Sequence, residues 1–321
     1  MAIDQASRNL LKGVAARRAK PLYESTPIEA RATMTWHDLG AGPAMVSVVD
    51  TVVATTDGHE FPVRVLTPTA EPRGTVVYFH GGGWVLGDID GFDTLGRTLA
   101  IAANVRVVLV GYRLAPEFPY PAAVDDAWLA LNWVFAQRGN YADGLEKCIG
   151  SWGAGPVVLA GDSAGGNLAI ATAVNAEAAG LHISAVLLVY PVTDTNTSRP
   201  SYVDPENQLL ISKRSMEWFL DHYVDADSRA DPRVSPLHLK DLSRFPPTAL
   251  IRAEHDPLRD EGEEFADRLA ESGVPLQDIL FEGQMHGFFQ MVNVLPASNR
   301  AIEWFADYLD RTVFTDRQEM K

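Results

Sequence analysis

The stretch VVLAGDSAGGNLAI, residues 157–170, decides the fold of this 321-residue chain. Its first four residues are apolar or β-branched and predict a short buried strand, and the small residues from Ala164 onward predict a helix. Between them stands GDSAG, residues 161–165, a G-x-S-x-G pattern in which the serine occupies a sharp strand-to-helix turn. Glycines on both sides allow the backbone to approach closely. The stretch therefore predicts a nucleophilic Ser163 at the end of a strand.

The rest of the chain alternates strands and helices in the same way. Short apolar runs between helical stretches are typical of βαβ units around a mostly parallel sheet, so we expect an α/β fold. The expected strands are 74–79, 105–110, 157–160, 185–190, 248–252 and 276–281, and the expected helices include 122–137, 163–179, 213–223, 258–272 and 297–312. Two earlier strands, 45–54 and 60–66, flank the turn pair Asp57-Gly58 and predict an antiparallel edge.

Two regions interrupt this alternation. Residues 1–44 precede the first strand, and residues 195–240 mix proline, aspartate and aromatic residues around a single helical piece. We expect both regions to pack together over the catalytic face as a helical cap that shapes a substrate pocket. The catalytic core then comprises residues 45–194 and 241–321.

Charge limits the classes of partner. The formal net charge is −15, which disfavours nucleic acid and anionic membrane surfaces. The first twenty residues differ, because they carry five basic residues and one acidic residue, with Ile3, Leu10, Leu11 and Val14 near helical spacing. This pattern fits either an amphipathic helix on a membrane surface or a helix that packs its apolar stripe on the protein body. We favour the second, and expect no stable membrane association.

Cysteine usage and hydropathy indicate a cytoplasmic location. Cys148 is the single cysteine, so neither an intrachain disulfide nor a cysteine-rich zinc site can form. No apolar run approaches the roughly 18 residues of a membrane span, and the first residues lack the apolar stretch of a secretory signal.

The sequence HGGGW, residues 80–84, directly follows a predicted strand. Three glycines there could form a flexible turn or a phosphate cradle, but the chain contains neither of the glycine-rich nucleotide-binding patterns. An oxyanion hole explains them better, because glycines let backbone amides approach a developing negative charge. We expect the amides of Gly82, Gly83 and Ala164 to be the donors, with Gly81 as a further candidate. We expect His80 to brace this loop.

The serine requires a base and an acid. In this fold they follow the nucleophile in the order acid, histidine, and His286 is the only histidine after Asp256. Both residues follow predicted strands, where α/β sheets place their sites. The alternatives are a surface histidine at 286 and, at 256, the N-cap of a helix that begins at Leu258. Asp260 is a rival acid, but we expect it a turn inside that helix and prefer Asp256.

Other site features are less defined. The chain has no H-E-x-x-H or H-x-H pair, so we expect no metal and no cofactor. Pocket-lining candidates are apolar residues near the predicted site, each of which could equally be core packing: Trp84, Leu209, Leu210, Trp218 and Phe288.

Taken together, the motifs resemble the bacterial hormone-sensitive-lipase-like esterases (family IV), in the GDSAG branch. The matching strings are HGGGW (80–84), YRLAPE (112–117), FPYP (118–121), DDAW (125–128), GDSAGG (161–166), SPL (235–237), DPLRDEG (256–262) and HGF (286–288). The resemblance implies an α/β-hydrolase core with a helical cap, no cofactor, and hydrolysis of short to medium acyl esters. It also implies the triad of Ser163, Asp256 and His286, and makes a homodimer an option.

Rival functions remain open at this level. An amidase, a lactonase or a deacetylase that acts on a specific metabolite would use the same triad, because the triad does not determine the leaving group. A lipase acting at oil–water interfaces is a further option, although nothing in the chain resembles a long apolar lid. A ligand receptor on this scaffold, as in the plant gibberellin receptors, would be expected to lose part of the triad, whereas all three positions are filled here.

Overall fold

One mostly parallel sheet forms the centre of the molecule. The computed structural model describes residues 2–16, 20–33, 40–139, 152–153 and 155–315. Within these residues, eight strands follow the order β1-β2-β4-β3-β5-β6-β7-β8. Their bounds are β1 Ser47–Ala54, β2 Glu60–Thr67, β3 Thr75–Phe79, β4 Arg106–Val110, β5 Val157–Asp162, β6 Ala185–Val189, β7 Thr248–His255 and β8 Leu276–Met285. The predicted α/β fold is confirmed.

The antiparallel edge lies where the sequence placed it. Strand β1 pairs antiparallel with β2, and β2 pairs antiparallel with β4, whereas all later pairs are parallel. The hairpin turns at Gly58, whose φ of 86° a glycine adopts without strain. The amide of Thr55 donates to the carbonyl of His59 and closes the turn.

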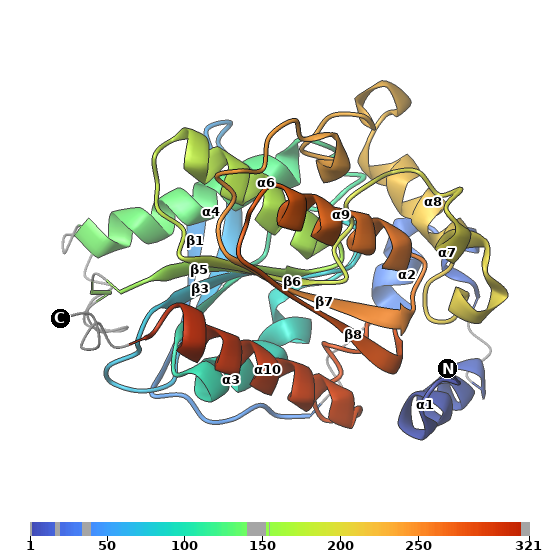
Figure 1. Ribbon diagram of the computed structural model, residues 1–321, viewed down its shortest axis with the longest axis horizontal. Coiled ribbons are helices and arrows are strands. Elements are labelled where there is room, and N and C mark those ends of the chain that lie inside the picture. The colour runs from blue at the N-terminus through green and yellow to red at the C-terminus, as the bar shows by residue number, and fades with distance from the viewer. Residues whose placement is uncertain (1, 17–19, 34–39, 140–151, 154, 316–321) are drawn as a thin grey trace.

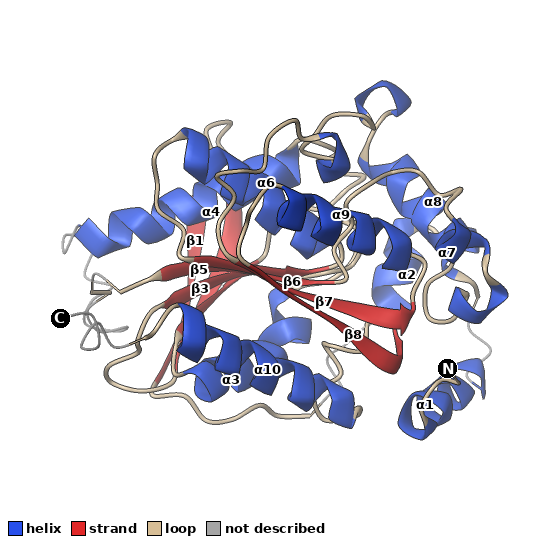
Figure 2. Cartoon of the chain, viewed as in Figure 1, coloured by secondary structure: helices blue, strands red, loops and turns tan. Residues whose placement is uncertain are grey.

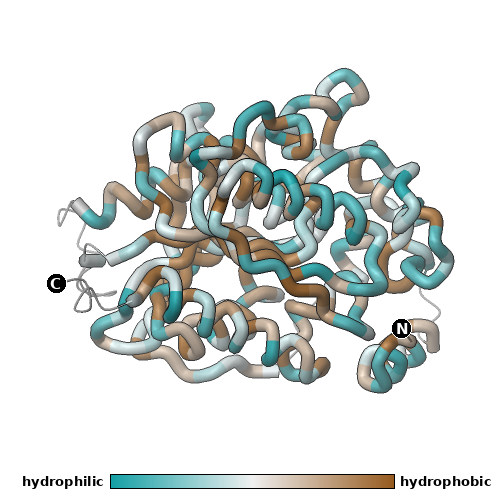
Figure 3. Tube along the Cα trace, in the orientation of Figure 1, coloured by the Kyte–Doolittle hydropathy of each residue, from teal (hydrophilic) through white to brown (hydrophobic). Residues whose placement is uncertain are grey.

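Helices cover both faces of the sheet (Figures 1 and 2). Helices α3 (Ile89–Ala103) and α10 (Pro296–Thr312) cover one face, and α4 (Ala122–Gly139), α6 (Ala164–Ala178) and α9 (Arg259–Glu271) cover the other. Every residue of the central strands β3, β4, β5 and β6 is buried. Continuous apolar runs are expected for parallel strands covered on both sides, and Figure 3 shows the hydrophobic segments concentrated at the sheet.

Strand β5 runs two residues further than the sequence predicted, to Asp162, and β7 and β8 run further still. Polar residues enter the second halves of β7 and β8, and the prediction therefore ended both strands early. In the structure the pairing continues across a bulge between Ala253 and His255, and His255 still pairs with Met285. As a result, β7 ends one residue before Asp256, and β8 ends one residue before His286.

The regions expected to form a cap contain short helices. These are the 3₁₀ helix η1 (Leu22–Glu24), α2 (Pro27–Thr33), α7 (Pro200–Val203), η2 (Pro205–Asn207), α8 (Lys213–Tyr223), η3 (Ala226–Ser228) and η4 (Pro236–His238). The two regions touch each other: Trp218 Nε1 donates to the carbonyl of Ser25 at 3.1 Å, and the Arg214 guanidinium lies 3.8 Å from the centre of the Tyr23 ring. Helices α2, α7 and α8 lie beyond the ends of β7 and β8 (Figure 1).

Helix α1 (Gln5–Ala16) lies apart from α8 (Figure 1). Gln284 Nε2, on β8, donates to the Asp4 carboxylate at 2.6 Å. Leu10 and Leu11 pack against the core on the α3 and α10 face of the sheet. Of the two alternatives for this basic segment, the structure therefore shows a helix packed on the body. In the described part of the chain, no helix is long and apolar enough to cross a membrane.

A buried ion pair fixes the start of α4. Arg113 Nη2 lies 2.7 Å from Asp126 Oδ1, and the amide of Arg113 donates to the same carboxylate at 2.8 Å. The Asp126 side chain is fully buried and that of Arg113 is 9% exposed. Removing Asp126 leaves the largely buried guanidinium with an exposed carboxylate, Asp57, as its remaining ion-pair partner. We expect Asp126→Ala to lower the free energy of unfolding by about 3–5 kcal/mol in urea titrations.

The control for this variant is Asp57→Ala. Asp57 pairs with the same guanidinium at 2.8 Å, but its side chain is 55% exposed. An exposed ion pair contributes little to stability, so the control should lose much less stability than Asp126→Ala. Equal losses of unfolding free energy in the two variants would contradict the view that burial makes the Asp126 pair the more important one.

Candidate active site

Close backbone packing holds Ser163 in a strained turn. Its φ of 55° and ψ of −120° place it in a region that residues with side chains rarely adopt. A Cβ on Gly161 would overlap the backbone of Gly165, and a Cβ on Gly165 would overlap the carbonyl of Phe79. Both positions therefore require glycine, and they keep the serine at the N-terminus of α6.

Three predicted residues meet at the ends of three strands. Ser163 Oγ lies 3.0 Å from His286 Nε2, and His286 Nδ1 lies 2.8 Å from Asp256 Oδ2. Because the fully buried carboxylate accepts the Nδ1 proton, Nε2 remains free to accept the serine proton. The amide of Leu258 donates to the other Asp256 oxygen at 2.8 Å. Asp256 thus orients the histidine while its second oxygen is also satisfied.

The rival acid points elsewhere. Asp260 is the second residue of α9, nearer the start of the helix than the sequence suggested. Its Oδ2 accepts the amide of Ser201 at 2.7 Å, and its Oδ1 accepts the guanidinium of Arg259. Asp260 therefore anchors α7 and makes no hydrogen bond to His286.

The glycine loop follows β3, which pairs with the strand that leads to the serine. Gly82 and Gly83 have φ values of 118° and 60°. Within the described residues, no group accepts a hydrogen bond from the amides of Gly82, Gly83 or Ala164. The further candidate differs, because the amide of Gly81 donates to Asp162 Oδ1 at 2.9 Å. Three of the four amides are therefore available to a ligand, and Gly81 is not.

Asp162 is a site residue that the sequence analysis missed. Its carboxylate accepts the Tyr78 hydroxyl at 2.8 Å as well as the Gly81 amide. Burial raises the pKa of Asp162 to about 6, although the Tyr78 hydrogen bond and the nearby His286 favour its charged form. The sequence did contain a signal for this residue, because Asp162 is the one acidic residue of an otherwise apolar strand and ends it. Asp162 ties the glycine loop to β5.

His80 supports the same loop. Its Nδ1 donates to the carbonyl of Gly81 at 2.7 Å, and its ring stacks on Tyr112 with centroids 4.3 Å apart. Burial lowers the pKa of His80 to about 4, so the ring is neutral at physiological pH. A neutral, stacked imidazole fits the bracing role expected of it.

The five predicted pocket-lining side chains differ in exposure. Trp84 and Phe288 have no exposed surface, which matches the core-packing alternative, and Trp218 is 9% exposed. Leu209 and Leu210 are half-buried. A role of these five side chains in substrate binding stays a prediction.

Comparison with known proteins agrees with this geometry. Residues 76–290 match a family model described as the α/β-hydrolase fold. The ethyl acetate hydrolase of Pseudomonas putida is 36% identical over 273 residues, or 82% of each chain. The carboxylesterase NlhH of Mycobacterium tuberculosis is 38% identical over 249 residues, or 75% of each chain. This chain belongs to the α/β-hydrolase family of hormone-sensitive-lipase-like esterases.

Solved members of the family share its architecture over nearly the whole chain. A hyperthermophilic esterase from the archaeon Pyrobaculum calidifontis superimposes with a TM-score of 0.86 at 33% identity, covering 97% of this chain and 99% of that one. An ester hydrolase from the metagenome of Lake Arreo gives a TM-score of 0.86 at 32% identity, covering 98% and 100%. The resemblance inferred from the motifs is confirmed.

The raised pKa of Asp162 predicts a pH-dependent stability difference. Because its folded-state pKa of about 6 exceeds the ordinary 3.8, the folded state loses stability as pH rises from about 4 to about 6, and the loss is complete above pH 6. Asp162→Asn retains an oxygen acceptor for Tyr78 and Gly81 but cannot ionise. Relative to wild type, we expect the variant to gain on the order of 2 kcal/mol between pH 4.5 and 7.5, measured by urea unfolding.

Asp241→Asn provides a control of opposite sign. Asp241 is exposed, and the hydrogen bond from the Ser243 amide lowers its pKa. A lowered pKa adds stability that is fully present above the ordinary pKa of 3.8, so this variant should lose stability relative to wild type as pH rises toward 4 and show little further change between pH 4.5 and 7.5. If Asp162→Asn shows no relative gain over the same interval, burial of a charged Asp162 is contradicted.

Proposed function

We propose that Ser163, His286 and Asp256 carry out acyl transfer at the site bounded by the glycine loop. The protein is a serine carboxylesterase, as the esterases to which it is similar indicate. The single observation that carries the assignment of residues is the hydrogen-bonded series from Ser163 Oγ through His286 to Asp256. A nucleophile, its base and an orienting acid within 2.8–3.0 Å of each other are the arrangement that this chemistry requires.

The proposed reaction has two halves. Ser163 Oγ attacks the ester carbonyl while its proton moves to His286 Nε2, and the carbonyl oxygen becomes an oxyanion. The C–O bond to the alcohol then breaks, and His286 returns the proton to the departing alkoxide. Water repeats the sequence on the acyl-enzyme, releasing the carboxylic acid and restoring the serine hydroxyl.

Charge stabilisation comes from two directions. The amides of Gly82, Gly83 and Ala164 have no intramolecular acceptor in the described part of the chain, and each is proposed to donate to the oxyanion. One such donor typically contributes about 3 kcal/mol to transition-state stabilisation. Asp256 stabilises the imidazolium that forms on the other side of the serine.

Small esters of short to medium acyl chains are the substrates that we propose. A similar protein named for hydrolysis of ethyl acetate supports this class. We propose that residues 1–44 and 195–240 act as the cap that limits the acyl chain, around a core of residues 45–194 and 241–321. In the first of these regions, the start of α1 is held against β8, because Gln284 donates a hydrogen bond to Asp4. Helix α1 lies apart from α8 (Figure 1). We also propose that the protein forms a homodimer. A cytoplasmic location is consistent with its single cysteine.

An ester panel tests the proposed activity. We expect p-nitrophenyl acetate and butyrate to be hydrolysed faster than the decanoate and palmitate, with no loss of activity in EDTA. Ser163→Ala should lose nearly all turnover, because the residual catalysis of such sites without their nucleophile is orders of magnitude lower. Undiminished activity in this variant would refute the assignment. Inactivity of the wild type on all four esters would favour an amidase, lactonase, deacetylase or receptor.

A matched pair of variants tests the assignment of the acid. Asp256→Asn keeps the shape of the side chain but favours the wrong histidine tautomer, so we expect kcat to fall by about 10⁴-fold. Asp260→Asn changes a neighbouring acid that contacts Ser201 and not His286, and kcat should stay within about threefold of wild type. Steady-state kinetics on p-nitrophenyl butyrate measure both. The reverse order of effects would transfer the role to Asp260.

A further inference from the structure

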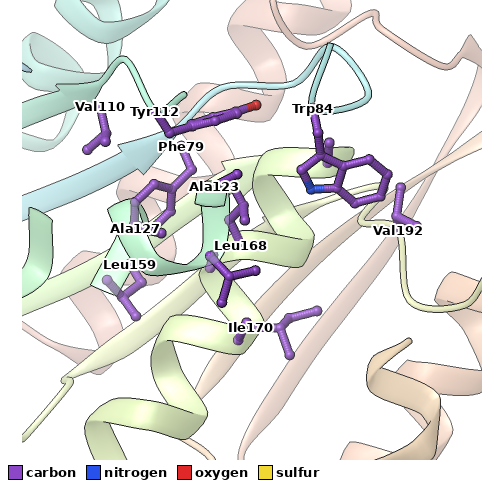
Figure 4. Close-up of a cluster of buried hydrophobic side chains, with 14 of the residues drawn as sticks. Phe79, Trp84, Val110, Tyr112, Ala123, Ala127, Leu159, Leu168, Ile170 and Val192 are labelled. Atoms are coloured by element: carbon purple, nitrogen blue, oxygen red, sulfur yellow. The ribbon is translucent and has the colours of Figure 1, made fainter. Parts of the chain in front are cut away.

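The residue that follows the oxyanion glycines is strained. Trp84 has a φ of 59°, a left-handed conformation that is strained for a residue with a side chain. Such strain persists only where the surroundings determine the conformation. The Trp84 indole is fully buried and stacks on Tyr223 of α8, with ring centroids 4.2 Å apart and an angle of 3° between the planes. Trp84 belongs to the larger hydrophobic core cluster, and Figure 4 shows it with other buried side chains of that cluster.

The same face of α8 also covers Gly83. Phe219 lies four residues before Tyr223 and therefore on the same side of the helix. A Cβ on Gly83 would overlap the ring of Phe219, so this ring lies directly against the backbone of an oxyanion-loop glycine. One helix of the proposed cap thus contacts two consecutive residues of the oxyanion loop.

The second region of the proposed cap grips the next residues. Arg31, on α2, donates from Nε to the carbonyl of Val85 at 2.8 Å and from Nη2 to the carbonyl of Ala115 at 2.7 Å. The amide of Ala115 in turn donates to the carbonyl of Trp84 at 2.9 Å. Residues 83–85 are therefore held from the side of the cap by both α2 and α8.

The core holds the other end of the loop. Asp162 accepts the amide of Gly81, and the carbonyl of Gly82 accepts the amides of Val85 and Leu86 in a tight turn. The direction of the amides of Gly82 and Gly83 therefore depends on contacts at both ends. Release of the contact with α8 would allow Trp84 to leave its strained conformation, which rotates the Gly83–Trp84 peptide. It would also free the Gly83 Cα, which Phe219 contacts and which joins that peptide to the one carrying the Gly83 amide.

We infer that Tyr223 and Phe219 of α8 are positioning residues of the oxyanion hole, so that the cap takes part in the chemical step as well as in enclosing the substrate. The inference rests on the proposed function of the glycine loop. The oxyanion exists only in the transition state and the tetrahedral intermediate, so misdirected donors reduce kcat with little effect on ground-state binding. Loss of a whole donor typically lowers kcat by about 10²–10³-fold, which sets the upper limit for misplacement.

Two substitutions at Tyr223 separate the stacked ring from the hydroxyl. The hydroxyl has no hydrogen-bond partner in the described part of the chain, so Tyr223→Phe should keep kcat within about twofold. Tyr223→Leu removes the ring while retaining an apolar side chain, and we expect kcat on p-nitrophenyl butyrate to fall by about 10–100-fold with KM changed less than about threefold. Phe219→Leu should shift kcat in the same direction.

A transition-state analogue provides an independent measurement. A trifluoromethyl ketone adds to the serine and places an oxyanion in the hole, so its inhibition constant should rise in Tyr223→Leu in proportion to the loss of kcat/KM. Phe305→Leu is the stability control, since Phe305 is a buried aromatic residue of α10 on the opposite face of the sheet. It should lower the melting temperature while leaving kcat and inhibitor affinity near wild type.

The outcomes are distinct. If Tyr223→Leu is folded at the assay temperature and loses only stability, with kcat and inhibitor affinity unchanged, the stack is ordinary packing and the inference fails. If Tyr223→Leu does not fold, Phe219→Leu decides by the same criteria. Failure of the proposed function would appear separately, as a wild type without esterase activity or a Ser163→Ala variant that retains it.

Discussion

The contact that the site depends on is the packing of bare backbone between β3, β5 and the start of α6. Phe79 and Gly161 are register partners at the ends of adjacent parallel strands. Gly165 then touches the carbonyl of Phe79, and no residue with a side chain fits there. Because the chain leaves β3 into the glycine loop and leaves β5 into the serine turn, this one contact holds the start of the glycine loop against the serine turn.

The electrostatic arrangement follows from the same sheet. Strands β7 and β8 continue past the expected ends and deliver Asp256 and His286 to the serine. A second carboxylate, Asp162, is buried nearby and interacts favourably with a charged His286. The two carboxylates therefore approach one imidazole from different strands, Asp256 after β7 and Asp162 at the end of β5.

The sequence predicted the fold and the meeting of Ser163, Asp256 and His286 because these rest on local signals, namely strand patterns and short motifs. It could not show that the Gly81 amide is already engaged, because its acceptor, Asp162, lies 81 residues away. The strand ends were missed for a related reason, since polar residues in β8 are accommodated by pairing with β7. Burial of Trp84 likewise depends on a helix that arrives much later in the chain.

Backbone strain is concentrated at the site. In the described residues, four non-glycine residues have positive φ: Trp84, Asn104, Ser163 and Tyr190. Asn104 ends α3, where asparagine tolerates this conformation, and needs no further support. The other three lie beside the glycine loop, at the nucleophile, and against His286, whose ring centroid is 4.4 Å from that of Tyr190. Each is held by tertiary packing, so the geometry that catalysis requires is maintained by the folded core and its covering helices together.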